Sequence, residues 1–434
     1  MSLYKKEIRG EVNTEITNES ASNLGSVIGN FLSPESIVNV GRDDKPASQM
    51  ISRALTAGIM ATGRTVADYG VVPTPVVHYR SSFSNGNLLI TINTHLNTVA
   101  INIYSNYKIH LEQKQPEKVM GENVGQLTLI NEFLETYQTG LIGQINQKNI
   151  KTKKPKIVLE CSDKTVTPFI SQILTSFDVE NIVLSIESPN GNKERKFLET
   201  NPENISVVSS MVKNISADLG IILDNNGEQA YFIDENGNLL RDQTVLSIFA
   251  KHILAKEHGS VISSVVASLS LDDVVKENGG KLIKTPVDAI LSELDNPDVI
   301  FAGDEPGKYI FPQFQSCFDA IFASAMLIDI ICTEDKPLSK LAEEIPEYHR
   351  TGFSIKCDHE LKSQAIELLN NELRDKGELT TVDGVRADFD NSYILIRASC
   401  FQPMLKIYLE AKRPERLNQL TKEVNKIMNL INSS

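Results

Sequence analysis

Short apolar runs alternate with amphipathic stretches along this chain, and the alternation predicts an α/β protein. An apolar run at residues 37–43 is followed by helical periodicity at 47–61 and by a second run at 65–72. A third run, at 88–91, enters a polar segment at 92–97 that we expect to be a loop. The strand–helix–strand order begins again at residues 156 and 260. We therefore expect three similar α/β domains with mixed sheets covered by helices.

The pattern changes after Pro346. Apolar runs at 353–356, 393–397 and 405–410 stand between helical stretches at 359–376 and 413–431, which predicts a smaller C-terminal α+β domain. The polar, lysine-rich segment 144–155 is typical of a linker. The predicted domains are residues 1–146, 155–246, 257–346 and 351–434.

One stretch combines strand signals with candidate metal ligands. An apolar run at 220–223 leads into oxygen-bearing side chains at alternate positions, Asp224, Asn226 and Glu228, and a second run follows at 230–233. This order predicts a polar loop at the tip of one strand, held by the next strand. Such oxygens suit a hard cation such as magnesium, although an Asp–Asn-rich loop is more often a solvated turn.

Composition narrows the possible functions. The chain has 434 residues, enough for two to four domains, and 43 Lys+Arg against 56 Asp+Glu give a net charge of -13. This balance disfavours a nucleic-acid-binding surface. The apolar run at 320–328 is too short to span a bilayer, and the first residues lack the apolar core of a signal peptide. Five cysteines without CxxC spacing favour a reduced, cytoplasmic protein. From the net charge and the short apolar runs, we expect it to bind neither nucleic acid nor a membrane.

Several short motifs occur in the order found in one enzyme family. They are Glu7-Ile8-Arg9-Gly10, Val40-Gly41-Arg42-Asp43, Gly70-Val71-Val72-Pro73-Thr74-Pro75, Ala217-Asp218-Leu219-Gly220 and Arg397-Ala398-Ser399. With these motifs the chain resembles the α-D-phosphohexomutases, which include phosphoglucomutases, phosphomannomutases and phosphoglucosamine mutases. The resemblance implies four domains around a central cleft, with one functional loop from each domain.

The resemblance also implies a mechanism in which a phosphoserine, bound to magnesium, exchanges phosphate with a hexose phosphate through a bisphosphate. Thr94 occupies the position of that serine and is followed by His95, so these two are the catalytic candidates. The corresponding metal ligands are Asp224, Asn226 and Glu228. The candidates for phosphate and substrate binding are Arg9, Arg42, Asp304, Lys308, Arg397 and Ser399.

The same loops depart from the family pattern. Thr94 replaces serine, residues 224–229 replace Asp-Gly-Asp-Ala-Asp-Arg, and residues 302–308 replace Gly-Gly-Glu-x-Ser-Gly-His. In the phosphate loop, residues 400–402 replace Gly-Thr-Glu. In a separate motif, residues 284–288 replace Arg-Thr-x-Val-Gly, so Asp288 stands where the family has a glycine. Fewer charged ligands should leave magnesium binding weak or absent.

Three hypotheses follow from these departures. The leading one is a catalytically impaired protein, or pseudoenzyme, that binds a sugar phosphate or a protein partner. The alternative is an active mutase that uses phosphothreonine at Thr94. The third is a structural subunit that pairs with an active paralogue, and a homodimer is also compatible with the sequence.

Overall fold

The structure is a computed structural model that describes residues 3–83, 88–108, 117–161, 164–184, 202–358, 360–374, 377–399 and 403–433. The chain divides into two compact units. Unit 1 contains Met1–Leu240 and Gly307–Lys340, and unit 2 contains Arg241–Pro306 and Leu341–Ser434. The short helix α11 (Leu338–Glu343) crosses the division.

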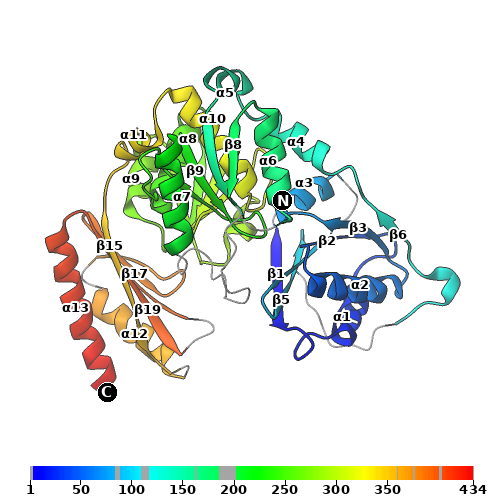
Figure 1. Cartoon of the computed structure of the whole chain (residues 1–434). Coiled ribbons are helices and arrows are strands. Elements are labelled where there is room, and N and C mark those ends of the chain that lie inside the picture. Colours follow the sequence, from blue (N-terminus) through cyan, green and yellow to red (C-terminus); the bar gives the residue numbers. More distant parts are fainter. Residues whose placement is uncertain are drawn as a thin grey trace. The chain divides into compact units, whose positions relative to one another are not determined.

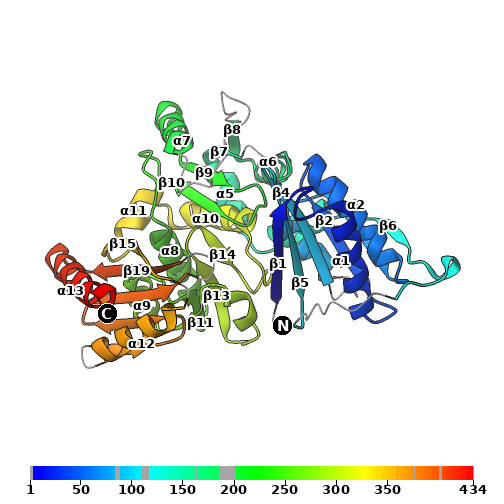
Figure 2. The ribbon, with the colours of Figure 1, turned by 90° about the horizontal axis from the view of Figure 1, so that it is seen from below.

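The first sheet of unit 1 is mixed. Its spatial order is β1 (Tyr4–Glu11), β5 (Thr98–Ser105), β4 (Leu88–His95), β2 (Ile37–Arg42), β3 (Thr65–Val71) and β6 (Leu127–Leu129). Strand β5 runs antiparallel to β1 and β4, whereas β2 is parallel to β3 and β4. Figure 2 shows β1, β5 and β4 side by side.

Helices α1 (Asn18–Phe31) and α2 (Pro46–Met60) pack together against this sheet (Figure 1). Their backbones approach closely at Gly25, where an added Cβ would lie 2.1 Å from the carbonyl oxygen of Leu55. Ile90, Ile92 and Val99 belong to the core beneath the two helices. This core fixes which face of β4 points toward α2.

The tip of β4 differs from the expectation. Residues 92–97 were predicted to be a loop, but β4 continues to His95 and β5 begins at Thr98. Only Leu96 and Asn97 form the turn, and Leu96 has φ +54°. The prediction was wrong because polar side chains at a strand tip resemble a loop in sequence, while the ladder between β4 and β5 satisfies their backbone groups.

The second sheet of unit 1 has the order β10 (Ala230–Ile233), β9 (Leu219–Leu223), β7 (Lys156–Glu160) and β8 (Glu180–Leu184). The pairing of β9 and β10 is antiparallel, so the polar loop lies between two paired strands as predicted, and β7 is parallel to β8 and β9. The other elements of unit 1 are α3 (Thr74–Ser81), η1 (Gly121–Asn123), α4 (Leu134–Ile142), α5 (Gln147–Lys153), α6 (Thr167–Ser176), α7 (Pro202–Ile215), β14 (Lys308–Ile310) and α10 (Ala320–Glu334).

Helix α5 corrects the prediction of a linker at 144–155. Its residue Ile150 is buried, and α5 packs against α10. The backbone N–H of Asn146 donates to Asp329 on α10 at 3.3 Å. The sequence did not predict this helix because only one of its side chains, Ile150, is buried, so no apolar periodicity stands out among its lysines.

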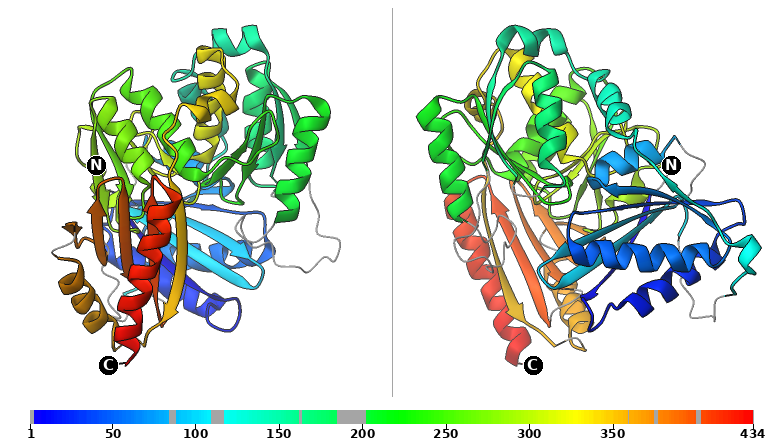
Figure 3. Two further views of the ribbon diagram at one scale, coloured as in Figure 1. Left: turned by 90° about the vertical axis from the view of Figure 1, so that its left-hand side faces the viewer. Right: turned by 45° about the vertical axis from the view of Figure 1, so that its right-hand side comes forward.

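Unit 2 contains a parallel sheet and an antiparallel sheet. Strand β11 (Ser260–Ser264) is parallel to β12 (Lys281–Thr285) and β13 (Val299–Asp304), accompanied by α8 (Asp242–Leu254), α9 (Leu269–Glu277) and η3 (Ile290–Glu293). The C-terminal sheet has the order β15 (His349–Lys356), β19 (Met404–Ala411), β18 (Ser392–Ala398), β17 (Val385–Phe389) and β16 (Glu378–Thr380). Helices α12 (Lys362–Leu373) and α13 (Pro414–Ser433) pack on this sheet, and Figure 3 shows α13 lying along it. The predicted α/β fold with mixed sheets and a C-terminal α+β part is thus confirmed, and the C-terminal sheet proves to be antiparallel.

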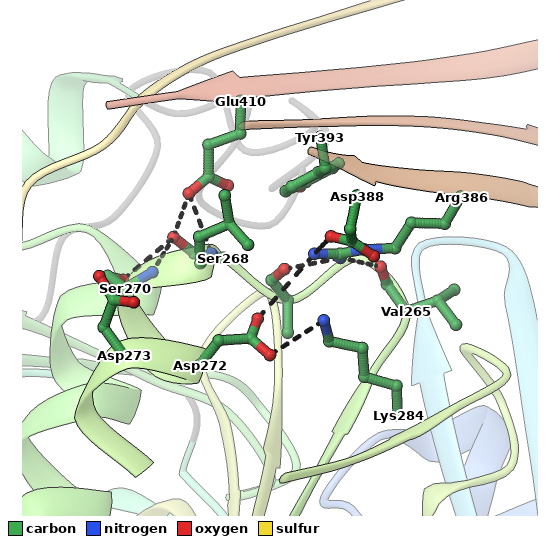
Figure 4. Close-up of polar contacts among 12 residues, drawn as sticks. Val265, Ser268, Ser270, Asp272, Asp273, Lys284, Arg386, Asp388, Tyr393 and Glu410 are labelled. Atoms are coloured by element: carbon green, nitrogen blue, oxygen red, sulfur yellow. Dashed lines mark hydrogen bonds and ion pairs between the residues drawn. The ribbon is translucent and has the colours of Figure 1, made fainter. Parts of the chain in front are cut away.

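A buried guanidinium joins the two sheets of unit 2. Arg386 on β17 is fully buried and donates to the carbonyls of Val265 and Ala267, at 2.6 and 3.0 Å. Its other nitrogens bind the Asp388 carboxylate, and its plane lies 3.8 Å from the ring centroid of Tyr393 (Figure 4). A buried guanidinium whose three nitrogens all donate hydrogen bonds fixes the geometry of the groups around it.

We predict that Arg386→Met lowers the free energy of unfolding by about 3–5 kcal/mol, because it leaves the half-buried Asp388 carboxylate and two carbonyls without their donor. Urea denaturation of the full chain, followed by circular dichroism, measures this loss. Arg413→Met, which removes the same charge from an exposed position of unit 2, should change stability by less than about 0.5 kcal/mol. Equal effects of the two substitutions would contradict the assignment.

Candidate functional site

Thr94 lies at the end of β4 and is held by two polar contacts. Its backbone N–H donates to Asp43 Oδ2 at 2.6 Å, and its hydroxyl lies 2.6 Å from Ser48 Oγ. Ser48 belongs to the first turn of α2, and Asp43 Oδ1 also accepts the backbone N–H of Lys45 at 3.0 Å. Thr94 is only 8% exposed. The arrangement brings a hydroxyl to a helix N-terminus, where a negative group is favoured.

The side chains of Thr94 and His95 point to opposite faces of the sheet. Thr94 pairs with Val99, which belongs to the core under α2, whereas His95 follows Asn93 on the other face. Arg9 shares the face of His95, because it pairs with Ala100, and Ala100 pairs with Asn93. The structure therefore groups His95 with Arg9 and separates both from the Thr94 hydroxyl.

The two candidate arginines of unit 1 have protein partners. Arg9 Nε lies 3.2 Å from Glu7 Oε1, and its side chain is 67% exposed. Arg42 donates to the carbonyl of Asp43 at 2.8 Å, which stabilises the backbone beside Thr94. Of the two, Arg9 has the more accessible charge.

The loop between β9 and β10 is fixed by its own backbone. Asp224 Oδ1 accepts the N–H groups of Glu228 and Gln229, at 2.8 and 3.1 Å. Two backbone carbonyls of the loop also accept hydrogen bonds. The carbonyl of Asn226 accepts the N–H of Thr74, the first residue of α3, at 3.0 Å, and the carbonyl of Gly227 accepts the N–H of Ala320, the first residue of α10, at 2.9 Å. Gly227 has φ +75°, which favours glycine at this turn.

The two carboxylates of the loop affect each other. Burial raises the pKa of Asp224 to about 7, and the charge of Glu228 adds to this rise, against the lowering by backbone hydrogen bonds. Glu228 Oε1 accepts the hydroxyl of Tyr104 on β5 at 2.9 Å. Burial, and then the nearby Glu228 charge, raise the pKa of Tyr104. Tyr104 lies on the sheet face that carries His95, so the loop contacts the face opposite the Thr94 hydroxyl.

The donor set fits a magnesium ion poorly. Asp224 Oδ1 is committed to its own loop, Glu228 Oε1 to Tyr104, and Asn226 is neutral. Within the described part of the chain, no group of three His, Cys, Asp or Glu side chains could hold a metal ion. Tight magnesium sites rely on carboxylates with free oxygens and good geometry.

The predicted sugar-binding residues fall in both units. In unit 2, Asp304 Oδ1 accepts the Ser264 hydroxyl at 2.6 Å and the N–H of Glu305 at 3.0 Å. The Glu305 carboxylate in turn binds Arg350 on β15, at 2.6 and 2.8 Å. In unit 1, the Lys308 ammonium lies 5.2 Å from the ring centroid of Phe318. Asp304 is buried, and hydrogen bonds from Ser264 and from the N–H of Glu305 fix the orientation of its carboxylate.

The predicted phosphate-binding residues of unit 2 lie at the end of β18. Arg397 is 9% exposed, and its Nη2 lies 2.8 Å from Asp383 Oδ2. The same oxygen accepts the N–H of Val287 at 3.3 Å. Lys362 Nζ donates to the carbonyl of Ser399 at 2.6 Å. Cys400 to Gln402, the altered part of this loop, lie outside the described residues.

Three partner residues were missed by sequence reasoning: Ser48, Tyr104 and Asp383. Each is distant in sequence from the side chain it contacts, so spacing gave no signal. Asp383 precedes Gly384, a pair that marks a turn, but a turn aspartate is not distinguished by its sequence from one that binds an arginine.

Comparison with known proteins establishes the family. Descriptions of the phosphoglucomutase/phosphomannomutase family match residues 1–118 (alpha/beta/alpha domain I), 241–348 (alpha/beta/alpha domain III) and 333–427 (C-terminal domain). A probable phosphoglucosamine mutase from Pyrococcus horikoshii is 30% identical over 449 residues, covering 97% of this chain and 96% of that protein. The chain belongs to the phosphoglucomutase/phosphomannomutase family, the α-D-phosphohexomutases, as its motifs predicted.

Solved structures share the fold. A phosphoglucomutase/phosphomannomutase family protein from Burkholderia thailandensis has a TM-score of 0.85 at 20% identity, covering 98% of this chain and 96% of that one. The N-acetylphosphoglucosamine mutase of Aspergillus fumigatus, solved with GlcNAc-6P and magnesium, has a TM-score of 0.59 at 12% identity, covering 92% and 78%. Among the residues that our structure describes, no helix has the length and apolar character that crossing a membrane requires.

We predict that Asn226→Asp strengthens magnesium binding, because it adds a carboxylate at the second of the alternating positions of the loop. At a magnesium concentration ten times the variant's Kd, the ion should stabilise the variant by about 1.4 kcal/mol, measured by thermal unfolding. Asn225→Asp, which adds the same charge at the neighbouring position, is the control. If the unsubstituted chain is stabilised by magnesium as strongly as the Asn226→Asp variant, the poor fit of the loop is refuted.

Proposed function

We propose that this chain is an intramolecular phosphotransferase that interconverts the 1-phosphate and the 6-phosphate of a hexose, with Thr94 carrying the transferred phosphoryl group. The proposal rests on the position of the Thr94 hydroxyl at the first turn of α2, 2.6 Å from Ser48 Oγ. Family membership along nearly the whole chain supports it. Because relatives are named as probable phosphoglucosamine mutases, glucosamine phosphate is the first substrate to test. These names favour the active mutase over the impaired protein that the altered loops suggested.

The contacts of Thr94 suit a phosphoryl carrier. When phosphothreonine reacts, the bond between phosphorus and Oγ1 breaks, a bond to a sugar hydroxyl oxygen forms, and the proton of that hydroxyl ends on Oγ1. The Ser48 hydroxyl can donate a hydrogen bond to Oγ1 as negative charge develops there. The second half-reaction reverses these bonds at the other phosphate of the bisphosphate sugar.

Asp43 supports this role without touching the reacting atoms. Its carboxylate fixes the backbone N–H of Thr94 and that of Lys45, at 2.6 and 3.0 Å. Because Asp43 binds the end of β4 and the residue before α2 at once, it holds the Thr94 hydroxyl against the start of α2. Phosphoryl transfer depends mainly on such positioning and on charge stabilisation. For substrate, the exposed Arg9 and His95 are proposed contacts on the other face.

A second candidate function is binding of a sugar phosphate without turnover. It is favoured by one observation: the Thr94 hydroxyl lies on the face of β4 opposite the one that the loop with Asp224 and Glu228 contacts. A phosphate on Thr94 would then receive little stabilisation from that loop or from a cation bound to it. This candidate keeps the family fold and assigns the chain to a binding role, alone or with a protein partner.

We predict that Thr94→Ala reduces mutase turnover by at least about 10³-fold, because it removes the phosphoryl acceptor. The assay follows glucosamine, glucose and mannose 1-phosphates, each with its 1,6-bisphosphate as activator. Thr94→Ser should retain turnover, since serine also offers a hydroxyl, and Thr98→Ala, on the next strand, should match the unsubstituted chain.

Two outcomes separate the candidates. Turnover that survives Thr94→Ala would refute the assignment of Thr94. No turnover by the unsubstituted chain, together with a raised melting temperature in the presence of a sugar phosphate, would favour the binding role instead.

A further inference from the structure

The contact between Arg397 and Asp383 leaves the arginine half satisfied. Only Nη2 of the guanidinium binds the Asp383 carboxylate, at 2.8 Å. Nε is buried, and no acceptor among the described residues lies within hydrogen-bonding distance of it. A buried donor without an acceptor is destabilising. The site as it stands therefore favours an additional acceptor.

The arrangement of donors matches an oxyanion with several oxygens. A guanidinium presents Nε and Nη in a fork that fits two oxygens of a phosphate. The N–H of Val287 points at the same carboxylate oxygen that Arg397 binds, at 3.3 Å. Arg397, Asp383 and the Val287 N–H together form what we call the Arg397 site. A carboxylate now fills part of it.

The charge around the Arg397 site also suits an anion. Lys362, at the start of α12, is buried and donates to the carbonyl of Ser399, two residues after Arg397. Two cationic side chains, Arg397 and Lys362, thus lie along this segment, and positive charge there favours an anionic ligand.

We propose that Asp383 is an internal competitor for phosphate at the Arg397 site, and that a phosphate group binds there by displacing the Asp383 carboxylate. The bound phosphate would accept hydrogen bonds from Arg397 Nε, Arg397 Nη2 and the Val287 N–H. Asp383 then sets how tightly this site holds the phosphate group of a sugar phosphate. This inference rests on the proposed function, because it takes phosphate-bearing sugars to be the ligands.

A purely structural role for the ion pair makes the opposite prediction. If Asp383 only orients Arg397 for the fold or for the ligand, removing its charge should weaken phosphate binding and lower stability. If Asp383 competes, removing its charge should strengthen phosphate binding. The sign of the change in affinity separates the two.

The test is calorimetric titration of the full chain with inorganic phosphate. Asp383→Asn, which keeps the shape but not the charge, should bind phosphate about tenfold more tightly than the unsubstituted chain, a gain of about 1.4 kcal/mol. Asp383→Glu keeps the charge and should bind phosphate no more tightly than the unsubstituted chain. Asp390→Asn removes a charge from an exposed position of the same sheet and should change the affinity less than twofold.

Arg397→Met should abolish the gain when combined with Asp383→Asn. Asp383→Ala serves if the asparagine variant does not fold, as judged by its circular dichroism. Unchanged or weaker phosphate binding by both neutral variants overturns the inference, and so does tighter binding that survives Arg397→Met. Turnover is measured on the same unsubstituted chain: turnover with no gain in the variants refutes the inference alone, whereas tighter binding with no turnover refutes the proposed mutase alone.

Discussion

The Asp43 carboxylate is the constraint on which the Thr94 site depends. It lies between the end of β2 and the start of α2, and its two oxygens hold the backbone of Thr94 and of Lys45. The N–H of Asp43 donates to the carbonyl of Ile92, so the carboxylate is fixed to β4 as well. Two segments distant in sequence, the junction of β2 with α2 and strand β4, therefore meet at one buried acid, and the Thr94 hydroxyl contacts α2 because of it. The first sheet places β4 beside α2, and Asp43 fixes the backbone of Thr94 against the start of that helix.

The other functional loops share a common property, because their charged side chains bind protein groups. Glu228 binds Tyr104, Asp304 binds Ser264, and Arg397 binds Asp383. A ligand that uses these side chains must exchange one set of contacts for another, so only the difference in free energy appears as affinity. In such a site, neutralising an internal partner changes the affinity for a ligand even though no contact to the ligand is added.

Much of the fold could be predicted from the sequence, and particular residues show why the rest could not. The runs at 37–43, 156–160 and 260–266 became β2, β7 and β11, because a buried strand needs consecutive apolar side chains. Helix α5 was missed because its lysines face solvent and only Ile150 is buried. The strand character of residues 92–95 was missed because pairing with β5, a long-range contact, overrides local polarity. For the site, motifs identified Thr94 and Arg397, but Ser48 and Asp383 depend on tertiary contacts that no local pattern encodes.

The central claim is that Thr94 carries the phosphoryl group, and peptide mapping tests it most directly. The full chain would be incubated with glucosamine 1,6-bisphosphate, digested and analysed by tandem mass spectrometry for phosphorylated residues. The account predicts a single phosphorylated site, at Thr94, that disappears when excess glucosamine 6-phosphate removes the phosphoryl group. A phosphoryl group on a different residue, or none on the chain while sugar phosphates interconvert, would contradict it.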